Sequence, residues 1–519
     1  MPPVTRRGFL HGTGTAGCLG LIGLRASAEA APARAARPAR PAKRPPNVIF
    51  FAFDDLCDWV QPLGYNQAKT PNLQRLAEMG VTFTRAHAPG VFCAPSRTAI
   101  FTGRHASTTG CYSHEIFRAD HPDLVTLQMA FNRGGYRTFG AGKLYHHVPG
   151  YVDLRGWDEY FTRSQEVRDM GWQMNGYLMD DAPRPDPCPY SPWYRKTDRR
   201  VTPGGFLEWG PIADDREEEM VDTVRTNWAC EVLRRRHEEP FFLALGLYTP
   251  HFPNYAPQKY FDLYDPEKID LPPYKEDDLD DLPAPVRKRF TNRGRIHKEL
   301  EELGAVREAV RGYLAAVSYG DAMLGRVLDA LDTSPHKDNT VIVVWSDHGY
   351  HHGEKGQWGK HTLWDRTSHV PFLWAGRDVA RNAKVDTTVS LIDMYATFVD
   401  LCGLPRPEGL EGTSLAPVLR DPSSAADRTV LLPHMERGSY AVMNDEWRYI
   451  RYAAGGEELY NVRDDPHEWT NLAGDSKYAD VKRKMRRAAP KEFAPSATPR
   501  RRLRLVVEGD AFHWERKKR

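Results

Sequence analysis

The amino-acid sequence predicts an α/β protein: a large, mixed and mostly parallel sheet sandwiched by helices, with a smaller C-terminal antiparallel α+β subdomain. Three observations support this fold class. Continuous apolar runs of strand length recur, such as NVIFFAF at 47–53, and such runs are typical of strands covered on both faces. Segments with helical spacing of apolar residues separate these runs. Near Leu404 the composition changes, and short strands joined by tight turns follow.

The elements of the main sheet follow from local signals. Thr70 is a suitable N-cap, Pro71 suits a first helical turn, and Gly80 is a natural end for that helix. The apolar residues of 306–331 recur at helical spacing. In chain order we expect a strand at 47–53, a helix from 71 to about 80, a helix at 123–133, a strand at 136–140, a helix at 217–236, a strand at 241–247, a helix at 306–331, and strands at 340–345 and 370–374.

The C-terminal part reads as a small antiparallel subdomain at 404–490. It contains expected strands at 440–443, 447–452 and 458–461, with Asn444-Asp445 joining the first two. Residues 491–519 are rich in Arg and Lys. We interpret them as a solvated basic tail, with a patch for an anionic polymer as the alternative.

The first 46 residues are expected to lie outside the fold. TRRGFL at 5–10 is a twin-arginine pattern, a weakly apolar Gly/Ala-rich stretch follows it, and Ala-Ser-Ala at 26–28 offers a cleavage site. We therefore predict a signal peptide at 1–30, a flexible Pro/Ala/Arg-rich leader at 31–46 and a catalytic domain at 47–403. The twin-arginine export machinery would carry the folded protein to the periplasm or beyond the cell.

Composition excludes several classes of protein. The 71 Lys and Arg residues nearly balance the 69 Asp and Glu residues, so overall charge gives no argument for a nucleic-acid partner. No apolar run after the N-terminus is long enough to span a bilayer, so we expect no transmembrane segment in the mature protein. Seven cysteines in 519 residues, one of them in the signal peptide, form no disulfide framework.

Polar residues fall directly after four of the expected strands. Ligands of open α/β sheets bind beyond the carboxyl ends of the strands, where such residues meet. A single case would indicate only a turn, but four together predict a site. The residues are Asp54 and Asp55 after the first strand, Lys143 and His146 after the second, His251 after the third, and Asp347 and His348 after the fourth.

The residue types indicate a hard cation beside an oxyanion. Three carboxylates do not share a small space without a cation, and oxygen ligands select Ca²⁺ or Mg²⁺. The histidines of 348–361 suggest zinc as an alternative, but the sequence has no Cys/His pair with the spacing of structural zinc sites. Arg97, Lys143 and Lys360 would complement a sulfate or phosphate ester, and His146 and His251 are candidate proton carriers.

One motif adds a family resemblance. Cys93-Ala-Pro-Ser-Arg97, followed by Thr-Gly-Arg at 102–104, resembles the signature of type I sulfatases in the alkaline-phosphatase-like superfamily. The resemblance covers roughly 47–472, with the landmarks FDDL, GKLYHH, LYTPH, SDHG and GQWGKH in the family's order. The histidine of SDHG and the spacing of GKLYHH make the chain most similar to the iduronate-2-sulfatase-like branch.

The resemblance implies a role for each candidate residue. A maturation enzyme would convert Cys93 to Cα-formylglycine, whose hydrate offers one hydroxyl to attack sulfur and a second to expel the sulfate. The implied metal ligands, usually for calcium, are Asp54, Asp55, the modified Cys93, Asp347 and His348. Arg97 would hold the hydrate, and Lys143 would bridge hydrate and sulfate. His251 and Lys360 would bind sulfate, one of them protonating the leaving alcohol, and His146 or, less favoured by spacing, His147 would regenerate the aldehyde.

The implied function is hydrolysis of sulfate esters, with sulfated sugars or polysaccharides as the expected substrates. His361 is the first candidate for contacts to the leaving group, with Trp364, His434 and Arg437 as further candidates. One alternative is a phosphonate monoester or phosphodiester hydrolase of the same superfamily. Another is a catalytically inactive, exported polysaccharide-binding protein in which Cys93 stays a thiol.

Overall fold

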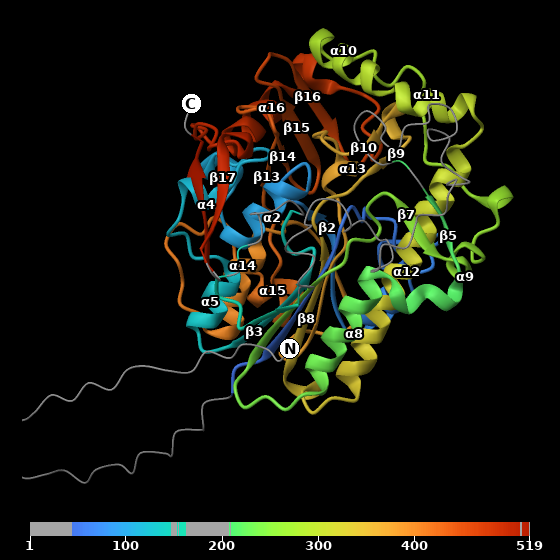
Figure 1. The fold of residues 1–519 in the computed structure, drawn as a ribbon. Helices are drawn as coiled ribbons and strands as arrows, with labels where there is room; N and C mark the ends of the chain where they lie inside the picture. Colours follow the sequence, from blue (N-terminus) through green and yellow to red (C-terminus); the bar gives the residue numbers. More distant parts are fainter. Residues whose placement is uncertain are drawn as a thin grey trace, which may run out of the picture. The chain divides into compact units, whose positions relative to one another are not determined.

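An eight-stranded mixed sheet organises the chain (Figure 1). The computed structural model describes residues 44–146, 153, 155–161, 207, 209–508 and 511–517. In spatial order its strands are β12 (Ala383–Ser390), β2 (Gly80–His87), β11 (Phe372–Gly376), β8 (Thr340–Ser346), β1 (Asn47–Phe53), β6 (Phe241–Gly246), β3 (Arg137–Gly142) and β4 (Glu159–Phe161). β11 runs antiparallel to both neighbours, and the other pairs are parallel. The predicted mixed, mostly parallel sheet is confirmed.

Helices cover both faces of this sheet (Figure 1). Alternate residues of β1 enter two separate cores, with Phe51 on one side and Phe50 on the other, and both are fully buried. Burying each such side chain contributes roughly 1.5–3 kcal/mol, which explains why the strand is apolar throughout. The helices that contribute to the first core include α1 (Pro71–Met79), α8 (Val221–Arg234) and α12 (Val306–Asp332), and those that contribute to the second include α2 (Cys93–Thr102), α5 (Leu127–Arg133) and α14 (Asp393–Cys402).

A second, antiparallel sheet lies in the C-terminal part. Its strands are β13 (Val430–Pro433), β14 (Tyr440–Met443), β15 (Trp447–Arg451) and β16 (Glu457–Asn461), and α16 (Ala479–Arg487) packs on it. Asn444 forms the expected turn, because its Oδ1 accepts hydrogen bonds from the N–H groups of Glu446 (3.0 Å) and Trp447 (2.8 Å).

Shorter elements complete the described chain. They are α3 (Ala106–Thr109), α4 (Phe117–Asp120), β5 (Trp209–Ile212), β7 (Asn254–Pro257), α9 (Gln258–Phe261), α10 (Ala284–Arg293), α11 (Arg295–Glu302), β9 (His351–His352), β10 (Trp358–Gly359), α13 (Asp365–Ser368), α15 (Ala416–Arg420), β17 (Leu503–Glu508) and β18 (Ala511–Arg516). No helix within the described ranges is long and apolar enough to cross a membrane.

Several local expectations differ from the structure. The helix expected at 123–133 begins only at Leu127, and the one expected at 217–236 begins at Val221 after a 3₁₀ turn. Thr70 precedes α1 without capping it, because its hydroxyl accepts a hydrogen bond from the N–H of Gln61 instead. The expected basic tail contains the antiparallel pair β17–β18. The signal peptide, most of the leader and His147 lie outside the described residues.

Candidate active site

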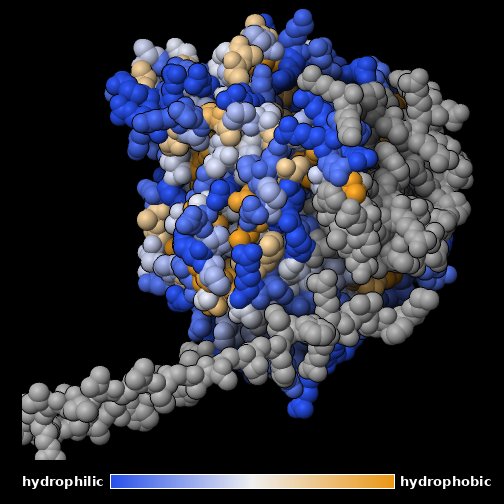
Figure 2. Space-filling view, turned by 60° about the vertical axis from the view of Figure 1, so that its left-hand side comes forward, coloured by the Kyte–Doolittle hydropathy of each residue, from blue (hydrophilic) through white to orange (hydrophobic). Residues whose placement is uncertain are grey.

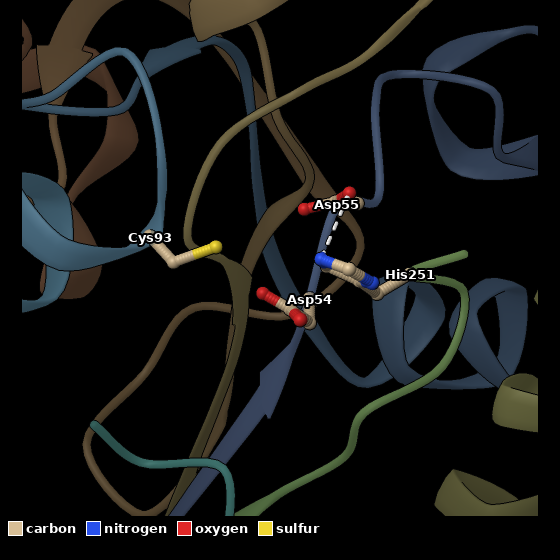
Figure 3. A group of neighbouring side chains, drawn as sticks. All are labelled: Asp54, Asp55, Cys93 and His251. Atoms are coloured by element: carbon tan, nitrogen blue, oxygen red, sulfur yellow. Dashed lines mark ion pairs between the residues drawn. The ribbon is translucent and has the colours of Figure 1, made fainter. Parts of the chain in front are cut away.

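The four predicted strand ends are neighbours in space. β8, β1, β6 and β3 lie side by side in that order, so the segments that follow them share one edge of the sheet. Figure 3 shows Asp54 and Asp55 at the end of β1, facing Cys93 on one side and His251 on the other. The expectation that the carboxyl ends of these strands converge is confirmed.

Asp55 has an unusual backbone that places two consecutive carboxylates in one site. Successive side chains of a strand point to opposite faces, but Asp55 has φ +64°, a left-handed conformation that aspartate tolerates better than most residues. Its N–H donates to Asp347 Oδ1 at 3.2 Å, and the Tyr313 hydroxyl donates to its carbonyl at 2.8 Å. These two bonds hold the turn.

Cys93 is the first residue of α2, and its side chain is buried. Its Sγ lies 3.2 Å from His348 Nε2, 3.3 Å from Lys360 Nζ and 3.8 Å from Lys143 Nζ. The Ser96 hydroxyl donates to the carbonyl of Asp347 at 2.5 Å, which fixes the first turn of α2 to the end of β8. Burial, reinforced by Asp54, raises the pKa of the Cys93 thiol despite the two lysines.

Arg97 ties the strand ends together from within α2. It is buried, and its Nε donates to Asp347 Oδ2 at 2.8 Å while Nη2 lies 3.3 Å from Asp54 Oδ1. It also donates to the carbonyls of Phe53 (3.2 Å) and Lys143. The Arg97 guanidinium therefore connects α2 to the ends of β1, β3 and β8.

Two lysines neutralise the two aspartates that follow β1. Lys143 pairs with Asp54, and Lys360 Nζ lies 2.6 Å from Asp55 Oδ1. Burial opposes ionisation of Asp54, but Lys143 and other nearby cations outweigh it and hold the pKa of Asp54 well below its usual value. At Asp347 burial outweighs the nearby cations: it raises the pKa of Asp347 to about 8, although the charge of Arg97 acts to lower that pKa.

Paired glycines let Lys143 enter the site. Gly142 and Gly246 are partners in the register of β3 and β6, and the Lys143 N–H donates to the carbonyl of Gly246 at 2.8 Å. A Cβ at Gly246 would collide with the carbonyl of Lys143, so this crossing requires glycine. Nothing in the local sequence pattern predicts this requirement.

The acidic cluster fits a hard cation. Two sets of possible ligands have donor atoms within 4.8 Å of one another: Asp54, Asp55, Cys93 and His251 in one, and Asp54, Cys93, Asp347 and His348 in the other. Asp55 Oδ2 is buried and has no hydrogen-bond partner among the described residues. Together the two sets offer three carboxylates, the ligand type that suits Ca²⁺ or Mg²⁺.

A hydrogen bond also fixes the orientation of the His348 ring. Its Nδ1 lies 2.9 Å from the carbonyl of Gly349, which can only accept, so Nδ1 carries the hydrogen. In the neutral ring Nε2 then presents a lone pair toward the carboxylates, 3.2 Å from Asp55 Oδ1. Burial lowers the pKa of His348, which favours this neutral form.

His251 occupies the far side of the cluster. Its Nδ1 contacts the carbonyl of Phe252, and Nε2 lies 3.8 Å from Asp55 Oδ2, the pair joined by the dashed line in Figure 3. Burial lowers the pKa of His251 to about 3, although Asp55 raises it. Asp222 positions this loop by accepting the N–H groups of Tyr248 (2.9 Å) and Thr249 (2.9 Å).

The other candidates lie outside this inner cluster. The rings of His146 and His361 have centroids 6.3 and 5.0 Å from that of Phe92, which precedes Cys93. His434 donates from Nε2 to the carbonyl of His361 at 3.3 Å. Trp364 is buried and donates to Glu458 Oε2 at 2.8 Å. Its expected place in the leaving-group pocket is therefore wrong, since it joins the C-terminal sheet to the loop of Lys360.

Two further residues, Arg293 and His114, lie close to the site and were not predicted from the sequence. The guanidinium of Arg293, at the end of α10, donates to the carbonyls of Lys360 (2.5 Å) and His361 (3.3 Å). The ring of His114 lies 5.3 Å from that of His146, centroid to centroid. Neither residue follows a strand of the main sheet, so no pattern in the sequence distinguished them from surface residues.

Comparison with known proteins decides the family. The sulfatase family matches residues 46–404, and a "Sulfatase" of Formosa agariphila is 36% identical over 463 residues, which span 86% of this chain and 87% of the relative. The chain belongs to the sulfatase family. This sulfatase is a sulfuric ester hydrolase, and the resemblance inferred from Cys93–Arg97 is confirmed.

Further matches show which other proteins this sulfatase is similar to. The family described as "N-sulphoglucosamine sulphohydrolase, C-terminal" matches residues 353–492. Human iduronate 2-sulfatase is 29% identical over 347 residues, covering 63% of this chain and 59% of the relative. The phosphonate monoester hydrolase of Silicibacter pomeroyi superposes with a TM-score of 0.69 at 20% identity, covering 91% of this chain and all of that one, which shows a shared fold.

Proposed function

We propose that this sulfatase removes sulfate from sulfated sugars, using a formylglycine at position 93 and a bound divalent cation. The observation that carries the proposal is the position of Cys93 Sγ, at the start of α2 and within 4 Å of His348, Lys143 and Lys360. Sγ marks where the oxygens of a formylglycine hydrate would stand. The sugar-directed names of the C-terminal family and of iduronate 2-sulfatase support a glycan substrate.

The hydrate of formylglycine supplies an oxygen nucleophile for sulfur and a second hydroxyl for releasing the product. Around it, Lys143 and Lys360 supply positive charge for the oxygens of a sulfate group, in a site shielded from water. Lys360 Nζ lies 3.3 Å from Sγ, which favours Lys360 over His251 as the donor of a proton to the leaving alcohol. His146 would accept a proton when the aldehyde is regenerated.

Asp54, Asp55, Asp347 and His348 would hold the cation, with calcium as the expected ion and magnesium as the alternative. When bound, such an ion lowers the pKa of a coordinated hydroxyl and stabilises negative charge on the transferred group. Arg97 would keep Asp54 and Asp347 oriented, since its guanidinium spans both carboxylates. Arg97 would also hold the formylglycine hydrate.

The proposal extends to maturation and export. A formylglycine-generating enzyme would act on the unfolded Cys93 segment, and the twin-arginine pattern TRRGFL would direct the folded product to the periplasm or outside. These two steps are compatible, because modification and folding would both precede export.

Sulfate release from a panel of esters tests the activity. The panel holds sulfated oligosaccharides, an aryl sulfate, choline sulfate and an aryl phosphonate, and the protein is co-produced with a maturation enzyme. We expect release from a sulfated sugar, abolished by Cys93→Ala and by a chelator. Preferred cleavage of the phosphonate would support the alternative suggested by the shared fold. Binding of sulfated glycans without any turnover, with formylglycine verified, would support the binding-protein alternative.

A further inference from the structure

His114 borders the entrance to the active site. The centroid of its ring lies 5.1 Å from that of Phe92 and 5.3 Å from that of His146. Because Phe92 immediately precedes Cys93, the segment that carries His114 lies one side chain away from the reacting position. His361 approaches Phe92 as well, with a centroid distance of 5.0 Å. The imidazoles of His114 and His361 therefore lie against the residue before the nucleophile, as that of His146 does.

The chain returns to this entrance near its C-terminus. Residues 493–502, here called the C-terminal arm, run alongside residues 107–114. The N–H groups of Ala494, Ala497 and Arg500 donate to the carbonyls of Ser107 (2.7 Å), Gly110 (2.9 Å) and His114 (3.2 Å). These bonds recur along the arm, so its backbone is fixed against the segment at the entrance.

Side chains fasten the arm at both ends. Thr498 is held by Asp120, which accepts from its N–H at 2.6 Å and from its hydroxyl at 2.8 Å. The guanidinium of Arg437 donates twice to the carbonyl of Phe493, at 2.9 and 2.6 Å. Gly110 has φ +75°, and a Cβ there would collide with the carbonyl of Pro495, so the close approach of arm and segment requires glycine at this position.

The arm brings a permanent positive charge to the entrance. Arg500, whose N–H is bonded to His114, also acts on the His114 ring: burial lowers the pKa of His114, and the charges of Arg500 and Lys360 lower it further. The pKa of His361 is lowered by burial in the same sense. The two imidazoles are thus neutral partners for hydroxyl groups, and Arg500 supplies charge beyond the inner lysines.

The surroundings of the arm suit a polar ligand. Of the described residues visible in Figure 2, which brings this side of the molecule forward, most are hydrophilic, and apolar residues occur singly or in small groups. The nearest acid in the segment, Glu115, is buried and accepts from the N–H of Ser113. This bond directs the Glu115 carboxylate to the backbone of its own segment, while the backbone of Glu115 pairs with Pro499, the residue before Arg500.

We propose that Arg500 and His114 form a subsite for a second anionic group, a carboxylate or a second sulfate, on the sugar whose ester is cut. Arg437 is a positioning residue, since it holds the arm at Phe493. This subsite rests on the proposed function and specifies it: the preferred substrates carry at least two negative charges, one at the ester and one at the arm. Guanidinium groups recognise carboxylates and sulfates through paired hydrogen bonds.

The test compares Arg500→Gln with Arg501→Gln, a matched loss of one charge on the same arm. Both are assayed on a disulfated disaccharide and on an aryl sulfate that has no second anion. We expect Arg500→Gln to lower kcat/KM for the disaccharide by about tenfold, as for loss of a charge-assisted hydrogen bond, and to change the aryl sulfate rate less than twofold. Arg501→Gln should change neither, and Arg500→Lys should restore part of the loss.

Equal losses on both substrates, or equal effects of the two arginine variants, would overturn the subsite. Binding of the disaccharide to the Cys93→Ala protein separates this outcome from failure of the proposed function. If the wild type with verified formylglycine releases no sulfate, the proposed function fails. If the disaccharide binds Cys93→Ala protein equally well with and without Arg500→Gln, the subsite fails independently of turnover.

Discussion

The inner cluster and the outer rim of this site are built in different ways. The inner residues Asp54, Lys143 and Asp347 are buried and follow directly from strands that lie side by side. The rim residues His114 and Arg500 come from a loop and from the C-terminal arm, far apart in sequence. We therefore expect the strand ends to fix the inner cluster and the segments outside the sheet to influence which leaving group is accepted.

The two regions also differ in how much each charge matters for stability. A buried ion pair that loses one partner leaves an uncompensated charge, at a cost of about 3–5 kcal/mol. Exposed charges contribute about 0–1 kcal/mol. Variants of the inner cluster should therefore affect both folding and catalysis, and variants of the rim should affect only substrate choice.

The largest expected effect lies at the nucleophile. Cys93→Ala should lower kcat on the order of 10⁴-fold or more, because it removes the group that attacks sulfur. Cys402→Ala is the matched control, since Cys402 is also buried but lies at the end of α14. The rates of sulfate release by the two purified proteins are compared. Comparable activity of both would show that Cys93 is not the nucleophile.

Next comes the cation site. Asp347→Asn keeps the shape of the side chain but removes a charge that Arg97 and the cation would share. We expect calcium affinity to fall by 10-fold or more and activity to fall with it. Thermal unfolding with and without calcium gives a readout independent of turnover. Asp386→Asn, at an exposed carboxylate paired with Arg85 (2.9 Å), should behave as wild type; a calcium response unchanged in Asp347→Asn would refute this ligand set.

A smaller effect is expected where the C-terminal sheet supports the site. Arg448 on β15 is buried and pairs with Asp365 (2.5 Å) and Glu468 (2.9 Å), in the loop and C-terminal segments around Lys360. Arg448→Met should lower the free energy of unfolding by about 3–5 kcal/mol. Urea unfolding measures it, with Arg451→Met on the exposed face of the same strand as the control. Equal midpoints for both variants would show that this network is not stabilising.

The smallest expected effect is a pH dependence of stability. Burial opposes the protonated form of His369, but Asp365, 3.1 Å from Nδ1, raises the pKa of His369 to about 9. The unfolded value is about 6.5, so the stabilisation is complete below about pH 6.5 and disappears as pH rises through 9. The deficit of His369→Gln in urea midpoint should be larger at pH 6 than at pH 9.5, whereas a deficit that grows with pH would contradict the assignment.

The sequence predicted the inner cluster because strand ends leave a strong signal. An apolar run such as Phe241–Leu247 identifies a buried strand, and the polar residue that follows it then has a known place. The strands β2 and β12 escaped prediction, since β2 follows α1 without a turn and β12 is only partly buried. The antiparallel direction of β11 is likewise invisible in its own five residues.

The rim was not predicted because its position depends on long-range pairing. The arm appeared as a solvated tail, since RRRLR at 500–504 shows no periodicity that separates a bound segment from a free one. Three backbone hydrogen bonds join it to residues 107–114, and such bonds leave no trace in the side-chain pattern. Trp364 was misplaced for the converse reason: its neighbours in sequence lie near the site, but its partner Glu458 is 94 residues away.

The proposed role of formylglycine at position 93 is tested most directly by measuring the modification of Cys93 and the rate of sulfate release in the same samples. Protein is produced with graded amounts of a maturation enzyme, and the mass of the tryptic peptide 86–97 gives the fraction of formylglycine in each sample. We expect sulfate release from a sulfated sugar to rise in proportion to this fraction and to extrapolate to zero for the unmodified thiol. Turnover that does not depend on the fraction of formylglycine would contradict the proposed role.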